Sequence, residues 1–450
     1  MFTDAPVRPE LYRKFEREVP QWYRDVKFGI FIHWGAYSVP AWAEPTGELG
    51  TVEPLEWMKH NPYAEWYANT IRIDGSPAQE HHRTVHGGAP YDDFLDQWTA
   101  SAFDPDDLVA LFARAGAGYV VPTTKHHDGI ALWDAPGTGT RNTVHRGPKR
   151  DLVAELAGAT RRAGLRFGTY YSGGLDWHVA DHGPHTGEPL ADNRPVDEAY
   201  NAYAFAHVVD LVDRYRPDVL WGDIEWPDAG KPDGPTSFAR ILERYYAAVP
   251  DGVVNDRWGL THWDFRTSEY QAGKESESTG AWENCRGVGL SFGYNQVEGA
   301  DQYLDGPGAV RHLLDVVSRG GNFLLNVGPD EAGRIPELQR RCLEGIADWM
   351  AVNASAVHGT TTVEGATPSD APWVRFTRTG DVVHAVVDAA GEVALDLPGA
   401  DPGSARLPDG TPVAARADGD RVVVDVPAPA VPGPVVVDLA VDPAVRGGRA

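Results

Sequence analysis

The sequence predicts an α/β protein: a (β/α)8-like TIM barrel with irregular helices, followed by a C-terminal antiparallel β-sandwich. Three observations lead to this prediction. Up to about residue 355, eight short apolar runs alternate with helical segments, as expected for parallel strands buried on both faces. Beyond that point the helical period disappears, and Val-rich runs are separated by Gly, Pro and Asp. We therefore expect a barrel over residues 1–355 and a β-sandwich over residues 356–450.

The eight expected strands are spread over almost the whole barrel region. They are 27–34, 118–125, 166–172, 218–224, 253–258, 265–270, 289–294 and 322–328. Most have the length of an ordinary buried strand. The helices between the fifth, sixth and seventh strands are short or missing, and residues 35–117 form a long connection after the first strand. The barrel pattern is weakest at these two places.

The expected helices carry start and stop signals. In the first of them, Asp104 can cap the N-terminus, Pro105 stands at the first helical position, and Gly116 follows the last turn. The second helix, at 151–164, also ends in Gly. The remaining helices are expected at 197–215, 236–249, 308–321 and 335–352.

Composition and charge exclude some classes of binding partner for this protein. The 450 residues carry a formal net charge of −25, which argues against nucleic acid and an anionic membrane surface, because both bind basic patches. The sequence has no run of 18 apolar residues and no apolar segment near its start. We therefore expect no membrane anchor, no Sec-type signal and a cytoplasmic location. Cys285 and Cys342 lack metal-site spacing and are interpreted as free thiols, and a homo-oligomer is left open.

Polar and aromatic side chains gather at the ends of the expected strands, where barrel enzymes build their active sites. In the stretch DVLWGDIEWPD, an apolar run ends in Asp223 and so brings a carboxylate to the rim, although a solvated turn would give the same local pattern. Other strand ends carry His33, Lys125, His126, His127, Asp128, Tyr170, Asp256, Arg257, Glu269, Tyr270 and Asn326. Their convergence on one rim favours a functional site over a set of unrelated strand caps.

Two carboxylates beside aromatic side chains suggest glycoside hydrolysis. One acid attacks the anomeric carbon or activates water, and the other protonates the leaving oxygen. The 15 Trp and 17 Tyr residues agree with this hypothesis, because aromatic rings cover the apolar face of a sugar. Plain packing in a large barrel is the alternative explanation for so many aromatic residues.

Several motifs in a fixed order resemble the retaining α-L-fucosidases of glycoside hydrolase family 29, of the bacterial type. They are FGIFIHWGAYSVPAWAE, YAEWY, TTKHHDGIALW, GLRFGTYYSGGLDW, DVLWGDIEWP and NDRW, and the resemblance runs from about residue 10 to residue 360. It implies a barrel with irregular or missing helices and a C-terminal β-sandwich. It also implies an enzyme whose substrate is a fucosylated oligosaccharide or glycoside.

The same resemblance implies roles for the acids. Asp223 is the nucleophile at the end of the fourth strand. The segment FRTSEY resembles the one that supplies the general acid/base, which indicates Glu269. Glu65 in YAEWY and Glu283 in AWEN are the alternatives for this role. Glu225, two residues after the nucleophile, is interpreted as structural or as part of the rim.

A sugar-binding set is also implied by the resemblance. Its members should contact the hydroxyls or the ring, and they are His33, Glu65, Trp66, His126, His127, Tyr170, Trp221 and Arg257. An apolar nook for the C5 methyl of a deoxy sugar is expected as well, because a pocket built for a hydroxyl would leave polar groups unpaired. The candidates for this nook, with core packing as the alternative, are Phe31, Tyr63, Tyr270 and Phe292. Gly222, next to the nucleophile, can provide no side-chain hydrogen bond.

Two other functions are considered. A metal-dependent barrel hydrolase is suggested by KHHD and by the i, i+4 spacing of His82 and His86. Against it, adjacent residues such as His126 and His127 point to opposite sides of a strand. The histidines of residues 80–86 lie in a polar insertion, which favours a solvated surface. A non-catalytic sugar-binding protein is disfavoured by the presence of two candidate acids, and we expect neither a metal nor another cofactor.

Overall fold

The computed structural model describes residues 8–47, 53–179, 182–187, 193–270 and 280–441. In this part of the chain, eight parallel strands form one curled sheet with the order β5-β4-β3-β2-β1-β8-β7-β6. A parallel bridge between Asn255 and Phe265 brings the two edges of this sheet together. The strands are β1 (Phe28–Ile32), β2 (Tyr119–Lys125), β3 (Arg166–Ser172), β4 (Val219–Asp223), β5 (Val253–Val254), β6 (Arg266–Glu269), β7 (Trp282–Gly287) and β8 (Asn322–Val327). The predicted barrel fold is confirmed.

Side chains of the barrel strands alternate between two apolar clusters. In β1, Phe28, Ile30 and Ile32 belong to the cluster between the sheet and the helices. Phe31 belongs instead to the cluster inside the barrel. Every residue of β1 and β2 is buried. Burial on both faces explains why these strands are nearly continuous apolar runs in the sequence.

Several barrel helices begin at an aspartate that satisfies the backbone of the first turn. Asp104, Asp151, Asp197 and Asp305 each accept a hydrogen bond from a backbone N–H there. The helices that alternate with the barrel strands are α7 (Pro105–Arg114), α8 (Leu152–Arg162), α9 (Glu198–Tyr215), α10 (Phe238–Ala248), α11 (Gly306–Ser318) and α12 (Glu337–Asn353). Further helices are α1 (Glu10–Arg13), α2 (Gln21–Val26), η1 (Ala36–Ser38), α3 (Pro54–Trp57), η2 (Ala64–Trp66), α4 (Tyr67–Thr70), α5 (Pro77–His86) and α6 (Asp92–Gln97).

The seventh strand is not where the sequence predicted it. We expected residues 289–294, but β7 is Trp282–Gly287, and residues 288–294 contain no strand. The prediction was wrong because β7 carries Glu283, Asn284 and Arg286 and therefore has no apolar run. All three are nevertheless buried and hydrogen-bonded, which is how a polar strand can occupy a barrel interior.

Helices are missing from one of the connections where the sequence pattern was weak. Residues 255–265, which join β5 to β6, contain no helix. The connection from β1 to β2 is long because it holds η1, η2 and α3 to α6 in addition to α7. In the described part of the chain, no helix combines the length and the apolar character that crossing a membrane would require.

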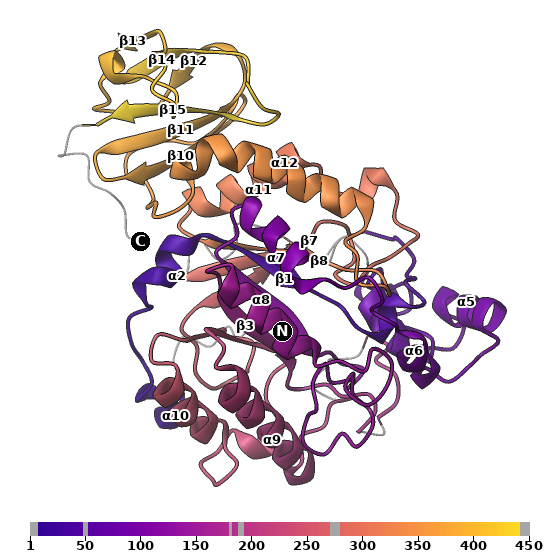
Figure 1. Ribbon diagram of the computed structural model, residues 1–450. Helices are drawn as coiled ribbons and strands as arrows, with labels where there is room; N and C mark the ends of the chain where they lie inside the picture. Colours follow the sequence, from indigo (N-terminus) through magenta and orange to yellow (C-terminus); the bar gives the residue numbers. More distant parts are fainter. Residues whose placement is uncertain (1–7, 48–52, 180–181, 188–192, 271–279, 442–450) are drawn as a thin grey trace.

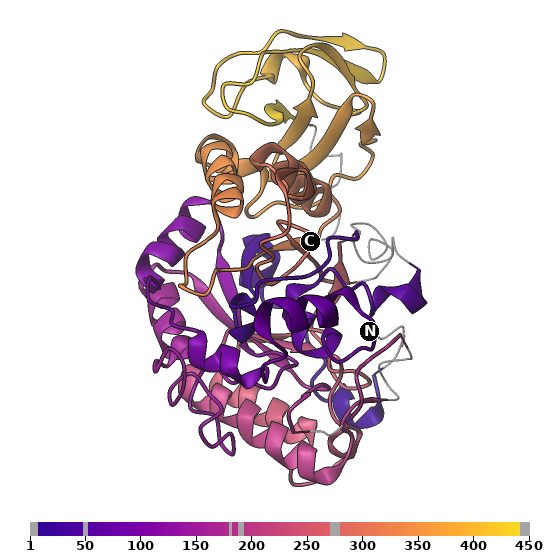
Figure 2. The ribbon, with the colours of Figure 1, turned by 90° about the vertical axis from the view of Figure 1, so that its right-hand side faces the viewer.

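The C-terminal part consists of two antiparallel sheets, as predicted (Figures 1 and 2). The first sheet has the order β15-β11-β10-β9 and the second the order β12-β14-β13. Their strands are β9 (Ser369–Asp370), β10 (Trp373–Thr379), β11 (Val382–Asp388), β12 (Gly391–Leu395), β13 (Ala415–Asp418), β14 (Arg421–Val426) and β15 (Val435–Ala440). Residues of both sheets, among them Phe376 and Val424, form a separate apolar cluster between them.

The sandwich packs on α11 and α12 of the barrel (Figure 1). Val386 and Val436 of its first sheet belong to the same apolar cluster as the barrel helices. The indole N–H of Trp349 in α12 donates a hydrogen bond to the carbonyl of Pro434 at 2.8 Å. The junction therefore combines apolar burial with specific hydrogen bonds.

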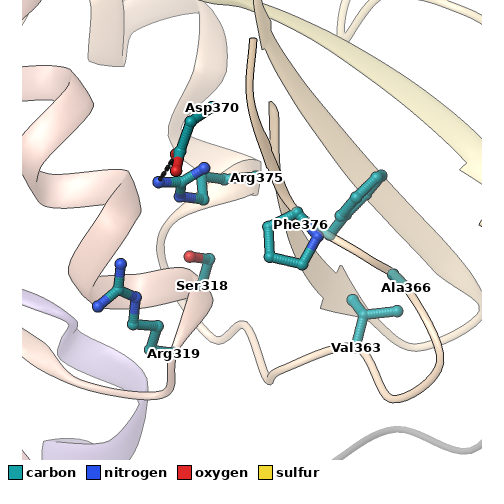
Figure 3. A pocket seen from close by; sticks show the side chains of 8 residues that line it. Ser318, Arg319, Val363, Ala366, Asp370, Arg375 and Phe376 are labelled. Carbon is teal, nitrogen blue, oxygen red and sulfur yellow. Dashed lines mark hydrogen bonds and ion pairs between the residues drawn. The ribbon is translucent and has the colours of Figure 1, made fainter. Parts of the chain in front are cut away.

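A cavity of about 180 Å³ lies at this junction (Figure 3). It is lined by Ser318, Arg319, Val363, Ala366, Pro368, Asp370, Arg375 and Phe376. The guanidinium of Arg375 contacts Asp315 of α11 at 2.6 Å and Asp370 of β9 at 2.9 Å. This buried arginine thus links the first sheet of the sandwich to the barrel.

Gly222 in β4 has no room for a side chain. A Cβ atom added there would stand 2.2 Å from Cε2 of Trp258, whose indole is fully buried. We predict that Gly222→Ala destabilises the protein by about 1–3 kcal/mol, the usual cost of overpacking a core. Urea unfolding followed by circular dichroism would measure the change.

Gly158 in α8 offers a matched control for this substitution. The nearest atom to its added Cβ is Nη1 of Arg162, at 3.1 Å, which is the flexible end of a long side chain. Gly158→Ala should therefore stabilise the helix, by up to about 1 kcal/mol. If Gly222→Ala unfolded at the same urea concentration as the wild type, the packing argument would be wrong.

Candidate active site

A cavity of about 200 Å³ lies at the carboxyl ends of the barrel strands. Its lining residues are Phe31, His33, Trp57, Met58, Tyr63, Glu65, Trp66, His126, His127, Tyr170, Trp221, Asp223, Ile224, Arg257, Glu269, Cys285 and Phe292. The carboxyl end of the strands is the face on which barrel enzymes carry their active sites. The structure thus gathers side chains from distant parts of the sequence around one space.

Of the catalytic and sugar-binding residues that the resemblance implies, all except Tyr270 line this cavity. Four other residues placed at the strand ends do not line it, namely Lys125, Asp128, Asp256 and Asn326. The Tyr270 hydroxyl donates to the carbonyl of Leu290, and its ring meets Phe292 edge-on at 5.5 Å between centroids. Tyr270 therefore supports the loop that carries Phe292. Of the other nook candidates, Phe31 and Tyr63 contact Phe292 edge-on and share the cavity wall with it.

Asp223 ends β4 and presents its carboxylate to the cavity. Oδ2 accepts a hydrogen bond from the Tyr170 hydroxyl at 2.8 Å, and Oδ1 lies 3.3 Å from Nη1 of Arg257. Burial alone would raise the pKa of this carboxyl. The Arg257 guanidinium and the Tyr170 hydroxyl outweigh burial and hold the pKa below its ordinary value. Asp223 is therefore ionised at neutral pH.

Glu269 ends β6 and faces the same arginine. Oε1 accepts a hydrogen bond from the Tyr63 hydroxyl at 2.9 Å, and Oε2 lies 3.0 Å from Nη1 of Arg257. One nitrogen atom thus contacts both Asp223 and Glu269. The two carboxylates must therefore stand close together.

Arg257 is itself held from several sides. Its Nε donates to the Thr267 hydroxyl at 3.0 Å, and Nη2 lies 3.6 Å from Sγ of Cys285. The guanidinium carbon lies 4.8 Å from the centroid of the Trp221 ring, within cation–π distance. Burial alone would lower the pKa of Arg257, but the surrounding acidic groups raise it above its ordinary value. The arginine is thus a permanent cation in a fixed orientation.

The residue after each of the two carboxylates has a left-handed backbone. Ile224 follows Asp223 with a φ of 56°, and Tyr270 follows Glu269 with a φ of 55°. This conformation costs roughly 1–2 kcal/mol for a residue with a side chain and is rarest for a β-branched one. Such strain clusters at functional sites. Here it ends each strand abruptly and leaves the carboxylate at the strand tip.

Glu225 continues the turn after Asp223 with a φ of 68°. Its N–H donates to the carbonyl of Arg257 at 2.8 Å. Its carboxylate lies 2.5 Å from Nζ of Lys231 and 3.3 Å from Nη2 of Arg194. These contacts hold the strained turn in place and give Glu225 a structural role.

Three histidines line the cavity in their neutral form. Nδ1 of His33 lies 2.7 Å from Oδ1 of Asn326, and Nδ1 of His127 lies 2.7 Å from the Ser172 hydroxyl. Burial lowers the pKa of His33 to about 4 and the pKa values of His126 and His127 well below the ordinary value. Nδ1 of His126 is buried, and no hydrogen-bond partner for it is found among the described residues. Neutral imidazoles can donate and accept hydrogen bonds, as hydroxyl recognition requires.

His126 and His127 both reach the cavity, contrary to the expectation that adjacent histidines point apart. β2 ends at Lys125, so the two histidines stand on irregular backbone where strand alternation no longer applies. Their ring centroids lie 4.0 Å apart. The argument from alternation therefore does not bear on the metal hypothesis.

The histidines of residues 80–86 lie on α5. His82 is only 7% exposed, and its ring nitrogens contact the Tyr67 hydroxyl at 3.2 Å and the Ala89 carbonyl at 2.8 Å. The expected solvated surface is wrong for His82, because α5 turns this residue inward against Tyr67. Across the described ranges, no group of three or more His, Cys, Asp or Glu side chains has an arrangement that could hold a metal ion.

The two alternative acids have other partners. Glu65 lines the cavity, and it accepts hydrogen bonds from the Gly293 N–H at 2.8 Å and the Ser291 hydroxyl at 3.1 Å. Burial raises its pKa to about 7. Glu283 is fully buried and is not among the lining residues. Both acids are thus engaged in holding the protein scaffold around the cavity.

Four lining residues were not singled out from the sequence. Trp57 and Met58 come from the connection between β1 and β2, whose pattern gave no strand end on which to place them. Ile224 enters the wall through the left-handed turn after Asp223. Cys285 was missed because the seventh strand was placed too late, and an inward-facing position on β7 would have indicated it.

A barrel with two neighbouring carboxylates at its strand ends, beside an aromatic cavity of this size, is the architecture of a glycoside hydrolase. Comparison with known proteins gives the family. The family profile described as Alpha-L-fucosidase matches residues 3–355. The chain belongs to the α-L-fucosidase family, as the motifs indicated.

Individual relatives agree with this assignment. An α-L-fucosidase of Dictyostelium discoideum is 34% identical over 355 residues, which cover 76% of this chain and 72% of the relative. A solved α-L-fucosidase structure is 43% identical with a TM-score of 0.89, covering 96% of this chain and 99% of that chain. The structure of Thermotoga maritima α-fucosidase in complex with fucose is 42% identical with a TM-score of 0.84, covering 94% and 97%.

Substitutions at Glu225 can separate backbone strain from ion pairing. Alanine removes the contacts to Arg194 and Lys231 but keeps a side chain at a φ of 68°. Glycine removes the same contacts and adopts this φ without steric cost. We expect Glu225→Gly to be more stable than Glu225→Ala by roughly 1 kcal/mol, measured by urea unfolding.

Glu344, in the interior of α12, is the control position. There the glycine variant should be the less stable one, by about 1 kcal/mol, because the backbone is helical. If the glycine variant were the less stable one at both positions, the turn after Asp223 would not be strained.

Proposed function

We propose that this chain is a retaining α-L-fucosidase that hydrolyses terminal α-L-fucosyl linkages, with Asp223 as nucleophile and Glu269 as general acid/base. The observation that carries the proposal is the Nη1 atom of Arg257, which lies 3.3 Å from Asp223 and 3.0 Å from Glu269. Carboxylates that share one nitrogen are compatible with the separation of about 5–5.5 Å found in retaining enzymes. Inverting enzymes need a wider separation of about 6.5–9.5 Å, so the shared contact favours retention. Membership of the family supports fucose as the sugar.

In the first step, an oxygen of Asp223 forms a bond to the anomeric carbon. The bond from this carbon to the leaving oxygen breaks with its electron pair, and Glu269 gives that oxygen its proton. The products are a β-fucosyl ester on Asp223 and the released alcohol. The lowered pKa of Asp223 supports this role, because it keeps the attacking group ionised.

In the second step, Glu269 is a carboxylate and acts as a base. It takes a proton from water while the water oxygen attacks the anomeric carbon and expels the carboxylate of Asp223. Two inversions leave α-L-fucose. Between the steps Asp223 is an uncharged ester and Glu269 a carboxylate, and the Arg257 cation lies beside this negative charge.

The remaining wall supports recognition of a single sugar ring, for which a cavity of about 200 Å³ has room. Polar groups for the hydroxyls would come from His33, Glu65, His126, His127 and Arg257, and flat aromatic surface from Trp66, Tyr170 and Trp221. Phe31, Tyr63 and Phe292 form a contiguous apolar group that fits a methyl substituent. The solved relative that contains fucose supports this choice of ligand.

Several sequence-based expectations stay predictions beside this proposal. They are the division of the chain at residue 355, the cytoplasmic location, the option of a homo-oligomer and the absence of a cofactor.

The wild-type enzyme should hydrolyse 4-nitrophenyl α-L-fucoside with retention. Proton NMR of the first sugar released should show the α anomer before mutarotation. A β anomer would contradict double displacement, and absence of hydrolysis would favour a sugar-binding protein without turnover. Loss of activity in EDTA that zinc or manganese restores would favour the metal-dependent hydrolase.

Replacement of the two acids should have different signatures. Glu269→Ala removes a proton donor that contributes roughly 10²–10⁴-fold to the rate. The poor leaving group of an oligosaccharide needs this proton, whereas 4-nitrophenolate departs without it. Azide needs no general base, so it should restore turnover of this variant and give α-fucosyl azide. Asp223→Ala should impair every substrate, and azide in place of the nucleophile should give β-fucosyl azide. Product analysis by NMR distinguishes the two azides.

Glu65→Ala is the control for this assignment. It should weaken sugar binding without dependence on the leaving group, because Glu65 is bonded to Gly293 and Ser291. If Glu65→Ala showed the leaving-group dependence and Glu269→Ala did not, the acid/base assignment would be wrong and the fucosidase function would stand.

A further inference from the structure

Glu283 is an acidic residue at the centre of the barrel that the proposed mechanism does not use. It lies on β7, and none of its surface is exposed. Its carboxylate accepts hydrogen bonds from the Tyr23 hydroxyl at 3.0 Å, from the Tyr119 hydroxyl, and from the Trp221 indole N–H at 2.9 Å. A carboxyl group buried so completely is costly unless its oxygens are satisfied. Here the three donors form hydrogen bonds with both oxygens.

The three donors differ in where they come from. Tyr23 belongs to α2 and Tyr119 to β2, and neither lines the cavity. Trp221 belongs to β4 and does line it. Glu283 is therefore joined to the scaffold by two hydroxyls and to the active site by one indole.

The Trp221 ring contacts the groups that hold both reacting acids. It stacks on Tyr170 with an interplanar angle of 23° and 5.6 Å between centroids. On it lies Arg257, with its guanidinium carbon 4.8 Å from the ring centroid. Tyr170 donates to Asp223, and Arg257 contacts both Asp223 and Glu269. A tilt of the indole would shift all of these contacts together.

We propose that Glu283 is a positioning residue that sets the orientation of the Trp221 indole and, through it, the placement of Tyr170 and Arg257 against the two reacting carboxylates. The inference rests on the proposed function. An indole N–H has a single donor direction, so one fixed acceptor determines how the ring stands. Burial raises the pKa of Glu283 to about 7, which agrees with a carboxyl group held away from solvent.

A double-mutant cycle tests whether Glu283 acts through Trp221. Glu283→Gln weakens the acceptor, and Trp221→Phe keeps an aromatic ring but removes the N–H. We expect each single variant to lower kcat/KM for 4-nitrophenyl α-L-fucoside roughly tenfold, and the double variant to fall no further than the weaker single variant. For Glu283→Gln, kcat should fall more than KM rises, because the shifted contacts bear on the reacting acids.

Tyr23→Phe is the matched control. It removes a hydrogen bond to the same carboxylate from the side away from the cavity. It should lower the thermal unfolding temperature and leave kcat/KM within about twofold of the wild type. If Tyr23→Phe lost as much activity as Glu283→Gln, Glu283 would be shown to act on the fold alone.

Glu283→Asp provides a second variant if the glutamine variant does not fold. It keeps a carboxyl group but shortens its reach, so the indole loses its close acceptor and the variant should show the same coupling to Trp221→Phe. If the losses of the two single variants multiply in the double variant, the inference is wrong. The proposed function still stands in that case, provided that the wild type turns over the substrate. A wild type that releases no 4-nitrophenol would instead refute the proposed function, and the positioning role with it.

Discussion

Nη1 of Arg257 lies between Asp223 and Glu269, and the geometry of the site depends on this shared contact. Two carboxylates taken out of water and brought near one another would bind protons to reduce their repulsion and desolvation. A guanidinium between them lowers both costs, and it cannot lose its own proton at any ordinary pH. The arginine thus makes a close pair of acids compatible with one of them being ionised. Thr267 and the Trp221 ring keep the cation where both acids can reach it.

The strand tips show how backbone geometry serves the same arrangement. β6 forms one edge of the curled sheet and β4 lies next to the other edge, β5; β4 and β6 each end at one of the acids. A left-handed residue follows each acid, so the chain leaves the strand direction directly after the carboxylate. The connection between β5 and β6, residues 255–265, also contains no helix. Irregularity in this barrel is therefore concentrated where the two acids have to meet.

The sequence predicted the parts of the fold that depend on apolar runs and on caps. β1, β2 and β8 are apolar and buried on both sides, and Asp104 and Asp151 begin helices, so local pattern and tertiary structure agree there. It failed at β7, where hydrogen bonds replace apolar burial and leave no periodic signal. Most lining residues could be named in advance because they end strands or match family motifs. Trp57 and Met58 could not, since their place depends on how a long connection folds over the barrel mouth.

The shared apolar cluster at the junction with the sandwich has a consequence for how the chain is divided. Val386 and Val436 complete a hydrophobic surface whose other members belong to the barrel helices. A chain that ended at residue 355 would therefore expose an apolar patch on the outer sides of α11 and α12, and such patches promote aggregation. The sandwich thus covers an apolar surface on the outside of the barrel, and the two parts resemble a single cooperative unit more than two independent domains.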